Sequence, residues 1–209
     1  MKRWQAISIF TIGAGAFGFT PIFVKLNFAA GHTLAELIVM QMVIAAAVLW
    51  LIPLFKKKTT KLSKKNILHL MLAGTFTGLT GIFYYASMQY IPASIAIVIL
   101  FQFVWIGIVY EWLFDKRKPS VTTYISVVLT LTGVIFAADV MSGDFSTLPF
   151  IGVILALLGA FFYAGFIYVS GRVATNVSPF LSAPLMMTGS LIMALIVFQP
   201  TFLFMEKIS

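Results

Sequence analysis

Six polar or aromatic side chains inside long apolar stretches are the residues of this chain best suited to bind a solute. Gln102 lies near the middle of one stretch, and Trp105 follows three residues later on the same side of a helix. Protein pockets hold organic molecules by apolar contact and a few oriented hydrogen bonds. We predict a mixed aromatic–polar site for a small-molecule solute, to which other stretches contribute Gln41, Tyr84, Tyr85 and Tyr163. In the alternative interpretation, these side chains only hydrogen-bond neighbouring helices.

Glu111 is an ionisable residue about one helical turn from the end of the stretch that contains Gln102. Ionisable groups are costly inside a bilayer and often have a function there, so Glu111 is a candidate for ion coupling. A second interpretation pairs it with Lys or Arg of the adjoining loops. Glu111 is nine residues from Gln102, which corresponds to about 900° of helical rotation, so the two side chains face opposite sides.

Motifs for enzymatic or metal chemistry are missing from the sequence. The chain has no cysteine, which excludes disulfides, thiolate metal sites and cysteine nucleophiles. His32 and His69 are not spaced as metal ligands, and neither H-E-x-x-H nor the phosphate-binding G-x-x-x-x-G-K-[ST] pattern occurs. We therefore expect no enzyme, no metal and no cofactor.

The elements that position these residues are long apolar stretches. Of the 209 residues, 61% are hydrophobic and only 10% are charged, against about 25% charged in soluble domains. About 20 apolar residues in a helix cross the hydrocarbon core of a bilayer. We predict an all-α integral membrane protein with about seven transmembrane helices, at Trp4–Val24, Leu34–Phe55, Ile67–Tyr84, Ile91–Phe114, Thr122–Val140, Phe150–Ser170 and Phe180–Phe198.

The positive charges predict the orientation of these helices. Short loops rich in Lys and Arg stay on the cytoplasmic side. Twelve of the 14 basic residues precede the first stretch or fall in every second gap: Lys2, Arg3, Lys56, Lys57, Lys58, Lys61, Lys64, Lys65, Lys116, Arg117, Lys118 and Arg172. The N-terminus is therefore expected in the cytoplasm and the C-terminus outside. Loops of this kind contact the lipid bilayer, so the net charge of +8 does not indicate nucleic acid.

Small residues recur at helical spacing, and one motif occurs twice. Gly74, Gly78 and Gly81 form a stripe that lets another helix approach closely, which also allows a homodimer. Gly15-Ala16-Phe17 returns 144 residues later as Gly159-Ala160-Phe161. Because five helices separate the two starts, the second copy has the opposite orientation, and inverted repeats are a hallmark of secondary transporters.

Several segments resemble the EamA family of the drug/metabolite transporter (DMT) superfamily: Gly13–Pro21, Tyr90–Val98, Glu111–Arg117 and Leu131–Ile135. The resemblance implies two five-helix copies of inverted topology. This chain would carry the first repeat at residues 1–141 and the first two helices of the second at residues 150–209, without the last three helices. Gln41 stands where the second helix of the family often has an arginine.

The resemblance also implies a function. The chain would be a secondary carrier, an exporter or importer of small organic metabolites or drugs, that works by alternating access in a bacterial plasma membrane. The alternative is a truncated, transport-incompetent member of the family, or a membrane partner protein that needs a second chain.

Overall fold

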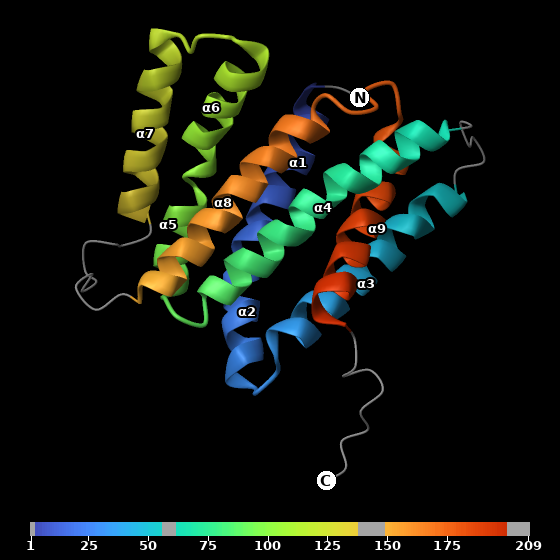
Figure 1. Cartoon of the computed structure of the whole chain (residues 1–209), viewed down its shortest axis with the longest axis horizontal. Helices are drawn as coiled ribbons and strands as arrows, with labels where there is room; N and C mark the ends of the chain where they lie inside the picture. Colours follow the sequence, from blue (N-terminus) through green and yellow to red (C-terminus); the bar gives the residue numbers. More distant parts are fainter. Residues whose placement is uncertain (1–2, 56–61, 138–148, 200–209) are drawn as a thin grey trace.

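A computed structural model describes residues 3–55, 62–137 and 149–199, and these residues form helices and no strand. The helices are α1 (Arg3–Gly18), α2 (Thr20–Ala29), α3 (Leu34–Phe55), α4 (Lys64–Ser87), α5 (Ala93–Leu100), α6 (Phe103–Asp115), α7 (Val121–Ala137), α8 (Phe150–Ser170) and α9 (Pro179–Phe198) (Figure 1). The predicted boundary at residue 141 lies outside the described residues, as do Lys2, Lys56, Lys57, Lys58, Lys61 and the C-terminal residues 200–209.

The apolar stretches of the sequence are the helices of the structure. Within the described ranges, six segments are long and apolar enough to cross a membrane: Thr11–Ala29, Leu34–Leu51, Lys64–Ser87, Ala93–Asp115, Phe150–Ser170 and Pro179–Phe198. A shorter apolar helix occupies Val121–Phe136 and overlaps the predicted span Thr122–Val140, whose last residues are not described. The all-α membrane fold is therefore confirmed.

Two of the predicted spans are interrupted. The first one breaks at Phe19 between α1 and α2, where Pro21 has no backbone N–H and its ring disfavours a continuous helix. The fourth one breaks at Phe101 and Gln102 between α5 and α6, where Gln102 N–H donates to the Ile99 carbonyl three residues back, at 3.0 Å. The proline of that stretch, Pro92, lies before the start of α5 and not at the break, so the sequence did not predict this second break.

Helix α4 is the centre of the bundle and packs against α8 on one side and α9 on the other (Figure 1). Glycines allow this approach, because a β-carbon at Gly74 would overlap the backbone of Met186, and one at Gly189 would overlap the backbone of Met71. Ser190 then donates a hydrogen bond of 2.6 Å to the Gly74 carbonyl. The glycine stripe of α4 is thus a helix-packing surface, as the sequence predicts.

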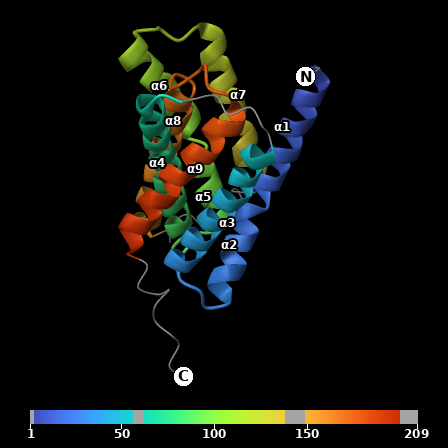
Figure 2. The same cartoon turned by 90° about the vertical axis from the view of Figure 1, so that its right-hand side faces the viewer.

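Helices α5 and α6 lie along the opposite side of α8 from the α3–α9 pair (Figure 1). Helix α1 lies at the edge of the bundle (Figure 2). A β-carbon at Gly13, Gly15 or Gly18 of α1 would meet no neighbouring atom within 4 Å. These three glycines of α1 therefore pack against none of the described helices, in contrast to Gly74 of α4 and Gly159 of α8.

The α4–α9 contact predicts how substitutions of glycine affect stability. Gly74→Ala should destabilise the protein by about 1–3 kcal/mol, because the added methyl group forces two backbones apart. Gly133→Ala in α7 meets open space and should be neutral or stabilising by up to about 1 kcal/mol, since alanine favours helices. Thermal unfolding of both variants in detergent tests this, and equal midpoints would contradict the close contact.

Candidate functional site

A cavity of about 140 Å³ lies between the central helices, next to α4. It brings together four of the six residues predicted to bind a solute: Gln41 of α3, Tyr84 and Tyr85 of α4, and Tyr163 of α8. The remaining lining residues are Phe17, Met42, Ala45, Thr77, Thr80, Gly81, Leu100, Met187 and Ser190. The lining is thus aromatic and hydroxyl-rich, of the mixed kind predicted from the sequence.

Hydrogen bonds fix some of these polar groups and leave others free. Gln41 Nε2 donates to the Tyr85 hydroxyl at 3.1 Å, which holds the two side chains together across α3 and α4. Thr80 donates to the carbonyl of Phe76 in its own helix. The hydroxyls of Tyr84 and Thr77, in contrast, are buried without a hydrogen-bonding partner. A buried polar group left unpaired costs about 1–3 kcal/mol, so these two hydroxyls are suited to receive a ligand.

Sequence reasoning missed Thr77, Thr80 and Ser190. Thr77, Thr80 and Tyr84 follow one another at spacings of three and four residues, which places them on one face of a helix. That periodicity was a usable signal. Ser190 carried no comparable signal, because its role depends on the approach of α9 to Gly74.

Aromatic contacts set the position of Tyr163. Its ring meets Phe103 edge to face, with centroids 4.7 Å apart and planes at 85°. This arrangement is one of the favoured geometries for aromatic pairs. Because Phe103 is the first residue of α6, the break between α5 and α6 places it next to the cavity-lining Tyr163.

Gln102 and Trp105 do not line the central cavity. Trp105 Nε1 donates to Gln102 Oε1 at 2.8 Å, and Gln102 Nε2 donates to the Val98 carbonyl at 3.3 Å. The Trp105 side chain is 44% exposed and borders a separate surface hollow beside Trp112. The structure thus joins these two residues to each other at the α5–α6 break and separates them from the other four candidates.

Glu111 belongs to a charged cluster at the ends of α6 and α8. Arg172 lies 4.0 Å from Glu111 and pairs directly with Asp115. Tyr168 donates a hydrogen bond of 2.9 Å to Asp115. The Arg172 guanidinium lies over the Tyr168 ring, 3.7 Å from its centroid. This geometry favours the pairing interpretation of Glu111. The hydrogen bond with Asp115 raises the pKa of Arg172 further, so the guanidinium stays charged at every physiological pH.

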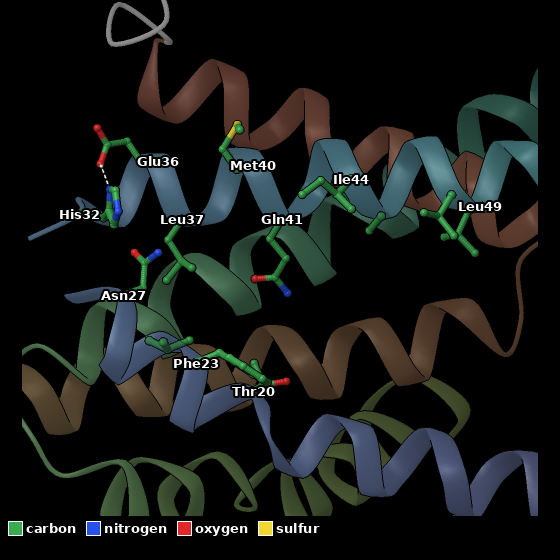
Figure 3. A pocket seen from close by; sticks show the side chains of 13 residues that line it. Thr20, Phe23, Asn27, His32, Glu36, Leu37, Met40, Gln41, Ile44 and Leu49 are labelled. Carbon is green, nitrogen blue, oxygen red and sulfur yellow. Dashed lines mark ion pairs between the residues drawn. The ribbon is translucent and has the colours of Figure 1, made fainter. Parts of the chain in front are cut away.

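An open groove of about 840 Å³ runs between α2 and α3 and adjoins the cavity (Figure 3). Gln41 and Ala45 line both spaces, so Gln41 lies at their boundary. Near one end of the groove, His32 Nδ1 lies 3.5 Å from Glu36 Oε2. Most other lining residues are apolar, such as Phe23, Leu37 and Ile44. The groove is thus a mainly apolar surface that shares two lining residues with the cavity.

Within the described ranges, no three His, Asp or Glu side chains come together as ligands of one ion would.

The free hydroxyl of Tyr84 predicts an unusual effect on stability. Tyr84→Phe should stabilise the ligand-free protein by about 1 kcal/mol, because it removes a buried unpaired hydroxyl and keeps the ring. Tyr85→Phe should destabilise it by about 1 kcal/mol, since Gln41 then loses its partner. Unfolding midpoints of the two variants check this, and a loss of stability in both would show that Tyr84 is paired.

Comparison with known proteins gives a family and no individual relative. The model of the EamA-like transporter family matches residues 4–138, which is well over half of the chain. No curated protein and no solved structure matches. Together with the apolar membrane-spanning helices, the match shows that this multi-pass membrane protein belongs to the EamA-like transporter family, which is part of the DMT superfamily.

Proposed function

We propose that the chain carries small organic solutes across the membrane by alternating access, with the central cavity as its binding site. Family membership supports a membrane transporter of the DMT type, and family members are transporters rather than enzymes. The observation that carries the proposal is that Gln41, Tyr84, Tyr85 and Tyr163, from three helices, line one cavity that adjoins an open groove.

The helix bounds support two copies of one unit. A shift of 144 residues moves α3, Leu34–Phe55, onto residues 178–199, and α9 occupies Pro179–Phe198. The same shift relates α8, Phe150–Ser170, to residues 6–26, which α1 and α2 cover. In inverted-repeat transporters, the solute binds between the copies, and one copy rocks against the other. The cavity fits this scheme because α3 and α4 belong to the first copy and α8 and α9 to the second.

The charged cluster is suited to close one end of the transport path. Arg172, in the loop between α8 and α9, reaches Asp115 at the end of α6, and therefore joins the two copies. The loop after α6 contains three further basic residues, which supports a cytoplasmic position for this end. We propose that this charged cluster closes the cytoplasmic end of the transport path, and we call it the inner closure. By the same charge pattern, we propose that the N-terminus is in the cytoplasm and the C-terminus on the outer side of the plasma membrane.

Reconstituted transport tests the proposal. Purified chain in proteoliposomes should exchange a labelled solute, found by screening small organic molecules, and Gln41→Ala should lower the rate about tenfold through a lost hydrogen bond in the cavity. Gln102→Ala and Trp105→Ala, which lie outside the cavity, should change it less than about twofold. Equal losses in all three variants would contradict the cavity as the site.

The inner closure predicts a change in accessibility. Because the chain has no cysteine, Ile108→Cys beside Arg172 is a clean reporter for a membrane-impermeant thiol reagent. Adding Arg172→Gln should speed its labelling from the cytoplasmic side several-fold, since Asp115 and Glu111 lose their common partner. Lys118→Gln removes one charge from the neighbouring loop and is the control. Unchanged labelling with Arg172→Gln would contradict the closure.

A second candidate function is that of a membrane protein that transports only together with a second chain, or a family member that does not transport. The observation that favours it is the open face of α1, α2 and α3, with the uncovered glycines of α1 and the broad groove. Transport by the purified chain alone would argue against both versions, whereas a folded chain without transport would favour them.

A further inference from the structure

We infer that the central cavity binds an uncharged molecule of about one aromatic ring in size, and that the Tyr84 and Thr77 hydroxyls recognise a hydroxyl or amide group on it. The biological role of this binding rests on the proposed transport function. The inference itself concerns only what the cavity binds, and not whether the chain transports it.

The chemistry of the lining disfavours a charged ligand. The residues around the cavity are aromatic, aliphatic, hydroxyl-bearing or amide side chains, and none is charged at neutral pH. An ion moved from water into such a site loses its hydration without gaining a counter-charge, which is far more costly than burying a neutral polar group.

Four charged side chains of neighbouring helices have partners outside the cavity. Arg172 pairs with Asp115 at the end of α6 and has Glu111 within 4.0 Å. Lys25 donates to the backbone carbonyls of Met88 and Ile91, where the positive charge also favours the C-terminal end of α4. None of these four side chains lines the cavity. A neutral solute is therefore the class that this site accepts.

The volume sets the size of the ligand. A cavity of about 140 Å³ is close to the engineered cavity of about 150 Å³ that holds one benzene molecule. Pockets for drug-sized molecules begin at about 300 Å³. In this conformation, the cavity thus takes a single ring or an aliphatic molecule of similar volume, and the rings of Tyr84, Tyr163 and Phe17 supply apolar contact.

The two free hydroxyls determine which polar group the ligand carries. Each hydroxyl can both donate and accept a hydrogen bond, so a hydroxyl or amide on the ligand can satisfy them. Tyr84 is held in place, because it is only 2% exposed and packs closely against Gly159 of α8. A β-carbon added at Gly159 would lie only 3.3 Å from the Cβ of Tyr84. A fixed donor loses little freedom on binding, which favours affinity.

Binding of four matched fluorinated probes to the full chain in lipid nanodiscs tests the inference by fluorine NMR. The probes are 4-fluorobenzyl alcohol, 4-fluorotoluene, 4-fluorobenzoate and 4-fluorobenzylamine, and empty nanodiscs give the background from partition into lipid. We expect saturable binding of the alcohol at one site per chain, and no saturable binding of the acid or the amine. Fluorotoluene should bind more weakly than the alcohol, because it leaves both hydroxyls unpaired.

Substitutions then test the recognition itself. Tyr84→Phe and Thr77→Val keep the shape of the cavity and should each weaken binding of the alcohol about threefold to tenfold, with little effect on fluorotoluene. Thr75→Val on the same helix is the matched control, because the Thr75 hydroxyl bonds to the carbonyl of Leu72 and does not line the cavity.

Three results would overturn the inference. The acid or the amine could bind saturably and as tightly as the alcohol, or the alcohol could bind equally to wild type and to both hydroxyl variants. The third is that no probe binds saturably to a chain that shows a cooperative unfolding transition and is therefore folded. The proposed transport function fails by a different result, the absence of cavity-dependent exchange in proteoliposomes. Binding without exchange would therefore support the inference and contradict transport by the chain alone.

Discussion

Close contact between helix backbones at glycine is the constraint on which this structure depends. Lipid is as apolar as the helices themselves, so burial of apolar surface drives helix association only weakly, and packing at short range matters more. Gly74 and Gly189 bring α4 and α9 into backbone contact, and Gly159 brings α8 against Tyr84. Helix α4 is therefore packed between α8 and α9, which lie far from it in the sequence.

The cavity is a product of the same packing. Helix α4 presents Gly74 and Gly78 to α9, whereas α8 presents its own Gly159 to α4. The hydroxyl-bearing residues of α4 line the cavity. Gly159 packs against the backbone and Cβ of Tyr84. The hydroxyl at the other end of the Tyr84 side chain has no hydrogen-bonding partner among the surrounding groups. Rigid packing at one end of a side chain and an unmet hydrogen bond at the other make a site whose polar group is held ready for a ligand. Stability lost at such a site is a common cost of function.

The helices could be predicted from the sequence, because long apolar stretches and alternating basic loops are properties of the chain alone. The cavity could be predicted in part: Gln41, Tyr84, Tyr85 and Tyr163 stood out as polar or aromatic groups in apolar stretches. Gln102 stood out for the same reason, yet its amide pairs with Trp105. Sequence spacing predicts which residues are neighbours on the same helix, three or four positions apart. It does not predict which other helix a residue faces. Ser190 shows the same limit, because its partner at Gly74 lies 116 residues away.

The contact between α3 and α9 links the cavity to the open groove. Under the proposed two-copy organisation, these helices are equivalent, so the approximate two-fold axis passes between them. On one side of this axis, α4 covers α9 and α8. On the other side, the equivalent surface of α3 and α2 is the groove. Since Gln41 lines both the groove and the cavity, its amide lies where the apolar route meets the hydroxyl-lined site. Under the proposed function, Gln41 is therefore the first polar side chain of the cavity that a solute from the groove meets, and the groove itself contributes mainly apolar contact.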